Sequence, residues 1–265
     1  MKKIRDAVHG EIIIQKEYFK TIIDTAEFQR LRHIEQTAIR SIYPSARHDR
    51  FIHSLGVFYI GQKLVEHLHK FVIEIEKDDD VKKIERSYLL ACLLHDIGHA
   101  PFSHTFEDYF GTQATLAEKL NKCINIVKEE KIKNPKNHEY TSAIISVTRF
   151  FEQIKCLGGD PEWVARMITG LKYEDDENSL IDCYIELLHG EVIDADRIDY
   201  ACRDVWASGY ATAQFDVSRL INSVVLTNRY SSPTWKIYYN SGAVNEIESL
   251  MKIREFQNRH VISRS

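Results

Sequence analysis

Residues 95–104 read His95-Asp96-Ile97-Gly98-His99-Ala100-Pro101-Phe102-Ser103-His104. The run before them, Tyr88–Leu94, is apolar on almost every side, which is typical of a central buried helix. Gly98 and Pro101 predict that this helix ends close to His95. A carboxylate buried beside a histidine costs several kcal/mol unless a partner offsets it. The stretch therefore predicts a His-Asp pair that holds a divalent cation at the end of a buried helix.

The same stretch invites one alternative. His95 and His99 are four residues apart, as in the H-E-x-x-H motif of zinc proteases. Position 96 is Asp, however, which is one methylene shorter than the usual general base. Gly98 and Pro101 would also break the helix that must present both histidines. We therefore reject the protease interpretation.

Helical periodicity covers most of the remaining chain. The predicted helices are Glu17–Arg40, Phe51–Val72, Val81–His95, one that starts at Asp160-Pro161, and one that runs from near Gly242 to Arg259. Strand signals are sparse: Glu11–Ile14, Val224–Thr227 and Trp235–Tyr239. These patterns predict a mainly α fold with a few short peripheral strands, as a single domain over 1–265. The last helix has no stop signal, so we expect the natural chain to continue.

Composition excludes several classes of protein. Of the 265 residues, 44% are hydrophobic and 28% are charged, which is typical of a soluble globular chain. The net charge of −4 gives no basic field for nucleic acid or anionic membrane. The five cysteines form no C-x-x-C pair, and no signal-like or membrane-spanning run occurs. We expect a cytoplasmic protein with no membrane contact and no stable nucleic-acid partner.

Two further blocks complete a metal-binding pattern. His53 lies in Arg47–Gly56, next to Arg50, and the second block is Asp194–Asp204. Together with residues 95 and 96 they supply two imidazoles and two carboxylates, in the order His…His-Asp…Asp. Such a shell suits Mn²⁺, Fe²⁺, Co²⁺, Ni²⁺ or Mg²⁺ and accommodates Zn²⁺. The residues alone leave Asp194 and Asp196 as rivals for the last position.

This order resembles the signature of the HD superfamily, and most closely the deoxynucleoside triphosphate triphosphohydrolases of the bacterial dGTPase and SAM-and-HD-domain type. The resembling segments span most of the chain: Asp6–Gly10, Ile23–Arg32, Arg50–Val57, His95–His104, His138-Glu139 and Asp194–Asp204. The chain departs from the family pattern at Ala7, Ile52 and Ala100, where Pro, Glu and Gly are usual. None of these departures removes a metal ligand or a catalytic group.

The resemblance implies a helical HD-domain bundle with one divalent metal ion per subunit at its centre. It assigns the ligands His53, His95, Asp96 and Asp196, the last by similarity to the D-x-D-x-x-D-Y string. It implies proton transfer by His104 with Glu107, and contact of His99 and His138 with the α-phosphate. It also implies phosphate-tail contacts from Arg50, Arg197 and Tyr200, and sugar contacts from Gln36, Tyr200 and Asp204. Asp24, Gln29 and Arg32 match positions that read an activating guanine nucleotide; the alternative is an ordinary amphipathic helix with an i, i+8 charge pair. The resemblance also implies a homo-oligomer.

The expected reaction is hydrolysis of a deoxynucleoside triphosphate to a deoxynucleoside and inorganic triphosphate. One alternative keeps the metal site but acts on another phosphoester, such as a nucleoside monophosphate or a cyclic dinucleotide, because fold and metal site do not fix the substrate. Another alternative is a non-catalytic nucleotide-binding protein. Its hallmark would be a lost ligand or catalytic histidine, and the sequence has lost neither.

Overall fold

The computed structural model describes residues 1–37, 43–73, 76–101, 109, 111–124, 135–173, 175–190, 193–209, 215–228 and 234–257. Regular structure in these ranges is almost all helical, which confirms the mainly α prediction. The α-helices are α1 (Lys16–Tyr18), α2 (Ala26–Gln29), α3 (Arg50–Val72), α4 (Asp78–Leu94), α5 (Gln113–Cys123), α6 (Asn137–Thr148), α7 (Phe151–Cys156), α8 (Pro161–Thr169), α9 (Ser179–Leu188), α10 (Ala195–Ser208), α11 (Val217–Asn222) and α12 (Val244–Gln257). None of these helices is long and apolar enough to cross a membrane.

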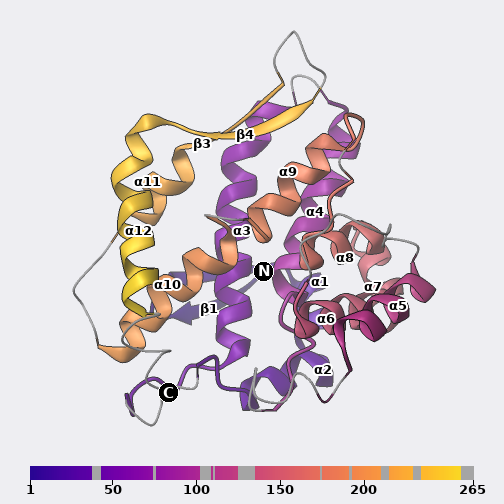
Figure 1. The fold of residues 1–265 in the computed structure, drawn as a ribbon, viewed down its shortest axis with the longest axis horizontal. Coiled ribbons are helices and arrows are strands. Elements are labelled where there is room, and N and C mark those ends of the chain that lie inside the picture. The colour runs from indigo at the N-terminus through magenta and orange to yellow at the C-terminus, as the bar shows by residue number, and fades with distance from the viewer. Residues whose placement is uncertain are drawn as a thin grey trace.

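The centre of the fold is the long helix α3. It packs against α4 on one side and α10 on another, while α4 also packs against α8 and α9 (Figure 1). Helix α3 begins where Asp49 accepts a hydrogen bond from the Ile52 amide, which satisfies a free N–H of the first turn. Its inner residues Leu55, Phe58 and Leu64 are buried, as the periodicity predicts.

Two hairpins lie at the periphery. Strand β1 (Lys2–Asp6) pairs antiparallel with β2 (Gly10–Ile14), and β3 (Val224–Asn228) pairs with β4 (Trp235–Tyr239). Three of the four strands coincide with the predicted runs. The sequence pattern misses β1 because its residues show little alternation of buried and exposed side chains.

The prediction of one continuous helix over Glu17–Arg40 is wrong for the part of this segment that the structure describes. The segment instead breaks into α1, a π-helical turn (Phe19–Ile23), α2 and a 3₁₀ turn (Arg30–His33). The reason is local, because the Thr25 side chain accepts from the Phe28 amide and starts a new helix. Ile22, Ile23, Phe28, Leu31 and Ile34 are nevertheless buried. The spacing of these residues therefore predicted the buried face of the segment but not the breaks between its helices.

The loop after α4 is fixed from two sides. Helix α4 ends at Leu94, and the Arg30 guanidinium donates to the carbonyls of Ile97 and His99, both at 2.7 Å. On the other side Gly98 lies against α6, where an added Cβ would overlap the Ser142 amide nitrogen. Gly98 therefore allows the loop and α6 to approach closely.

Candidate metal centre

Two buried imidazoles face each other at the core of the fold. His53 comes from α3 and His95 follows the last residue of α4, and their Nε2 atoms lie 3.3 Å apart. The Nδ1 of His95 lies 2.9 Å from the Cys92 carbonyl oxygen, and the Nδ1 of His53 lies 2.7 Å from a carboxylate oxygen of Asp199. Both partners are acceptors, so each Nδ1 carries the hydrogen of the neutral ring and each Nε2 presents its lone pair to the shared space.

Two carboxylates complete this cluster. Asp196 Oδ1 lies 2.8 Å from His53 Nε2 and 3.7 Å from His95 Nε2. Asp96 Oδ2 lies 3.7 and 3.5 Å from the same two nitrogens. The Asp196 side chain is 37% exposed, whereas those of His53 and Asp96 are 1% and 4% exposed. The donor cluster is therefore buried on one side and open beside Asp196.

The charges of these groups depend on one another. Burial opposes an imidazolium at His53, but the carboxylates of Asp196 and Asp199 outweigh burial and raise the pKa of His53 to about 10. Burial also opposes ionisation of Asp196, yet the hydrogen bond from His53 lowers the pKa of Asp196 to about 2. Burial opposes ionisation of Asp96, but the adjacent Arg50 guanidinium holds the pKa of Asp96 well below its usual range.

This donor set fits a divalent cation. Donor atoms of His53, His95 and Asp196 all lie within 4.8 Å of one another. Two inward lone pairs 3.3 Å apart repel unless a proton or a cation lies between them. Two imidazole nitrogens and two carboxylate oxygens form the mixed shell that first-row divalent ions accept, and the exposed side leaves room for water.

A second group of imidazoles adjoins the first. The other carboxylate oxygen of Asp96, Oδ1, lies 3.2 Å from His99 Nε2. The His99 ring stacks on that of His138, with centroids 4.0 Å apart and planes at 19°. Burial lowers the pKa of His99 well below its usual value, so this imidazole is neutral. The site therefore offers hydrogen-bonding imidazoles next to the donor cluster.

Asp194, the rival for the fourth ligand, has a different environment. Its side chain caps α10 by accepting from the Arg197 amide at 2.7 Å, and it also accepts from the Gly190 amide at 3.2 Å. Burial raises the pKa of Asp194 to about 7. Its oxygens thus satisfy backbone donors, while Asp196, two residues later, faces His53.

The substrate-binding residues expected from the resemblance have different partners in the structure. Arg50 donates to Asp96 Oδ2 at 2.5 Å. Arg197, on α10, donates to the carbonyl of Gly190 in the segment between α9 and α10. Asp204 accepts from His48 at 2.7 Å. Tyr200, on the same helix, is partly buried, and burial raises its pKa to about 12.

Gln36 and the expected regulatory residues lie farther along the N-terminal segment. The Gln36 amide donates to the His48 carbonyl, and its side-chain Oε1 is buried without a partner among the described residues. Arg32 donates to Gln29 at 2.8 Å, while Asp24 pairs loosely with Lys2 at 3.8 Å. His104 and Glu107, the expected proton-transfer pair, lie outside the described residues.

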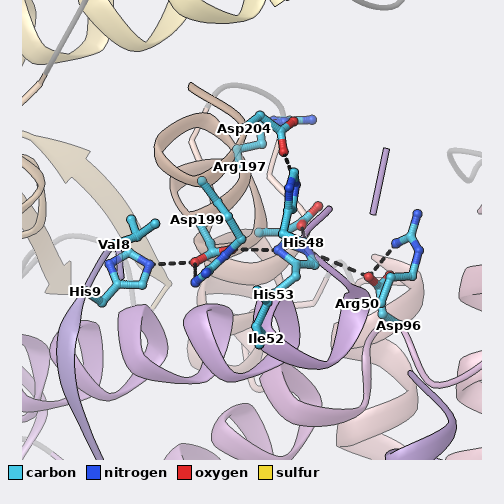
Figure 2. Close-up of polar contacts among 12 residues, drawn as sticks. Val8, His9, His48, Arg50, Ile52, His53, Asp96, Arg197, Asp199 and Asp204 are labelled. Atoms are coloured by element: carbon cyan, nitrogen blue, oxygen red, sulfur yellow. Dashed lines mark hydrogen bonds and ion pairs between the residues drawn. The ribbon is translucent and has the colours of Figure 1, made fainter. Parts of the chain in front are cut away.

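The sequence analysis missed a buried network behind His53. Asp199 accepts from His53, His9 and Arg203, and Arg203 also contacts Asp6. Figure 2 shows the row from His9 through Asp199 and His53 to Asp96 and Arg50. The sequence did contain a signal, since the partners of His53 in this network all fall within the resembling blocks Asp6–Gly10 and Asp194–Asp204. Nothing in the spacing indicated that they would meet.

Comparison with known proteins agrees with this geometry. The HD domain family model matches residues 50–200, which include all four proposed ligands. An uncharacterized protein of Methanocaldococcus jannaschii is 30% identical over 96% of this chain and 44% of its own length. A protein of Dictyostelium discoideum named deoxynucleoside triphosphate triphosphohydrolase SAMHD1 homolog is 30% identical over 83% of this chain and 39% of its own. The chain spans about half the length of the first relatives it matches.

A solved structure extends the agreement to the fold. The crystal structure of a hypothetical protein from Aquifex aeolicus superposes with a TM-score of 0.69 at 26% identity, and covers 98% of this chain and 59% of its own. The family model covers more than half of the sequence and begins and ends on the helices that carry the donor cluster. The chain therefore belongs to the HD domain family.

Proposed function

We propose that this chain is a metal-dependent phosphohydrolase that cleaves deoxynucleoside triphosphates to a deoxynucleoside and inorganic triphosphate. The observation that carries the proposal is the cluster of His53, His95 and Asp196, with Asp96 beside it, which is open on one side and adjoins the stacked pair His99 and His138. The proposed ligands are His53, His95, Asp96 and Asp196. The choice of substrate is supported by the names of the triphosphohydrolase relatives and by the sequence blocks shared with that family.

The division of labour among the side chains follows from their chemistry. A divalent ion bound to the four ligands would polarise a phosphate oxygen and acidify a water. Neutral His99, stacked on His138, would donate a hydrogen bond to the α-phosphate without adding a formal charge. Arg50 and Arg197 would hold the β- and γ-phosphates, because guanidinium groups match phosphate oxygens.

Proton transfer would fall to His104, oriented by Glu107. The leaving group in attack at the α-phosphorus is the 5′-oxygen of the sugar, which leaves poorly unless it is protonated. Gln36, Tyr200 and Asp204 would hold the sugar so that this oxygen stays in line. The His48–Asp204 hydrogen bond fixes one of these acceptors in advance.

One observation favours a smaller substrate. Arg197 donates to the Gly190 carbonyl and must release it before it can reach a phosphate tail. A nucleoside monophosphate or another simple phosphoester would need no such rearrangement. Hydrolysis of a monophosphate is therefore the second candidate function.

Product analysis separates the two candidates. The protein is incubated with each deoxynucleoside triphosphate and Mn²⁺ in H₂¹⁸O, and the products are resolved by ion-exchange chromatography. The proposal predicts a deoxynucleoside and intact triphosphate that carries the ¹⁸O label. His104→Ala should slow the reaction by about 10²- to 10⁴-fold, whereas His33→Ala, at an exposed histidine, should leave it unchanged. Stepwise release of orthophosphate would refute the proposal, and turnover of monophosphates alone would establish the second candidate.

A further inference from the structure

His53 lies between two carboxylates of the same helix. Asp196 and Asp199 are three residues apart on α10, so both point from one face of the helix toward α3. Asp196 Oδ1 lies 2.8 Å from His53 Nε2, and Asp199 Oδ2 lies 2.7 Å from His53 Nδ1. Only the first nitrogen faces the donor cluster. The two carboxylates therefore have different functions, although both are aspartates of the same D-x-D-x-x-D-Y string.

Asp199 is itself held rigidly. Its side chain is fully buried, and its two oxygens accept from Arg203 Nε and Nη2, each at 2.9 Å. His9 Nε2 lies 2.5 Å from the same carboxylate, and Arg203 is in turn anchored to Asp6 at 2.9 Å. Three groups, Arg203, His9 and His53, thus fix one carboxylate from three segments of the chain. Figure 2 shows the contacts of His9 and His53.

The helix backbones have approached closely to make this contact. Gly56 lies on α3 one turn after His53, and a Cβ at this position would overlap Asp199 Oδ1 and the Arg203 guanidinium. The absence of a side chain at Gly56 thus allows the Asp199 carboxylate to reach Nδ1 of His53. An ion pair that served only to join the helices would not need to reach the ring nitrogen.

We propose that Asp199 is a positioning residue that sets the tautomer and orientation of His53 for metal binding, with His9 and Arg203 holding Asp199 in place. The inference rests on the proposed metal centre but is independent of the substrate. A carboxylate that accepts from Nδ1–H directs the Nε2 lone pair inward and makes the imidazole a stronger ligand. His95 has only a neutral carbonyl in the same role, so the two imidazole ligands are supported unequally.

The test compares two variants in metal affinity. Asp199→Asn keeps the size of the side chain but presents an amide to three donors, so His53 loses its anionic acceptor. Asp6→Asn is the matched control, because it also removes a carboxylate from Arg203 yet leaves the Asp199–His53 contact intact. Affinity for Co²⁺ is measured by chelator competition, and the visible absorption of the Co²⁺ form reports ligand geometry. Circular dichroism and melting curves check that each variant folds.

We expect Asp199→Asn to weaken Co²⁺ binding by about 10- to 100-fold and to alter the absorption spectrum, while Asp6→Asn stays within about threefold at a similar loss of melting temperature. Equal affinities in the two variants would overturn the proposal. If Asp199→Asn does not fold, NMR of ¹⁵N-histidine-labelled wild-type protein with Zn²⁺ decides. The proposal predicts a proton on His53 Nδ1 and the metal on Nε2, and the opposite tautomer contradicts it. A wild-type protein that binds neither Co²⁺ nor Zn²⁺ would instead refute the metal centre.

Discussion

The Nε2 atoms of His53 and His95 face each other at 3.3 Å, with each ring anchored through its other nitrogen. In the protein without metal a proton relieves this contact, because Asp196 accepts from His53 and raises its pKa to about 10. A cation at the same place must expel that proton. The geometry thus links metal binding to pH.

Metal affinity should therefore rise with pH. At neutral pH the pKa of about 10 means that His53 is protonated before metal binds, so each binding event releases a proton. Affinity should increase by about tenfold per pH unit below that pKa. Chelator competition between about pH 6 and pH 9 measures the slope, and a weakly buffered titration measures the protons released. A flat profile with no release would show that His53 is not the ligand.

Arg30 should support the loop that carries the ligands. Arg30→Ala leaves the carbonyls of Ile97 and His99 without their donor, and we expect a loss of about 1–3 kcal/mol in the free energy of unfolding. Arg149→Ala, which breaks the exposed pair with Glu27, should cost less than about 1 kcal/mol. Urea denaturation of both variants gives the comparison. Equal losses would mean that the Arg30 contacts do not stabilise the loop.

Gly98 should tolerate no side chain. In Gly98→Ala the added methyl meets the backbone of α6, which carries His138, and overpacking of this kind costs about 1–3 kcal/mol. Gly242→Ala is a suitable control because nothing lies within 4 Å of its added Cβ. We expect the first variant to melt at a lower temperature and to turn over more slowly. Indistinguishable melting curves would contradict the close approach.

The expected nucleotide activation depends on Asp24, Gln29 and Arg32. The guanidinium carbon of Arg32 lies 3.5 Å from the ring centroid of Phe51, and Phe51 directly follows Arg50 in the sequence. A ligand that moves Arg32 would therefore also shift the segment that carries Arg50 to the metal centre. We predict that GTP stimulates dNTP hydrolysis and that Arg32→Ala abolishes the stimulation while it leaves metal content unchanged. Rates with and without GTP, together with the molecular mass in solution, test this. If GTP does not change the activity of the wild-type protein, the assignment of these residues to an activating nucleotide site is wrong.

The sequence predicted the helical class because this class depends on local patterns. The helix over Phe51–Val72 and the helix that ends at the His-Asp pair are long and strongly periodic, and the structure has both as α3 and α4. The capping pair Asp160-Pro161 also marked the start of α8 correctly. The segment Glu17–Arg40 failed, because periodicity reports the buried face and Thr25 decides where a new helix starts.

The network behind His53 was beyond sequence reasoning for a different reason. His9 and Asp199 are 190 residues apart, and their contact depends on how a hairpin turn, α3 and α10 pack together. The choice between Asp194 and Asp196 likewise depends on where α10 begins. Asp194 is the N-cap of this helix and accepts a hydrogen bond from its first turn, whereas Asp196 lies inside the first turn and contacts His53.

The most direct test of the account is the metal content of two neighbouring variants. Wild-type protein, Asp196→Ala and Asp194→Ala are purified without chelators and analysed by inductively coupled plasma mass spectrometry, with circular dichroism as the check on folding. The account predicts close to one divalent ion per chain in the wild type. Asp196→Ala should lose most of it, whereas Asp194→Ala should retain it and lose only about 1 kcal/mol of stability with its helix cap. Full metal content in Asp196→Ala, or loss in Asp194→Ala alone, would contradict the proposed centre.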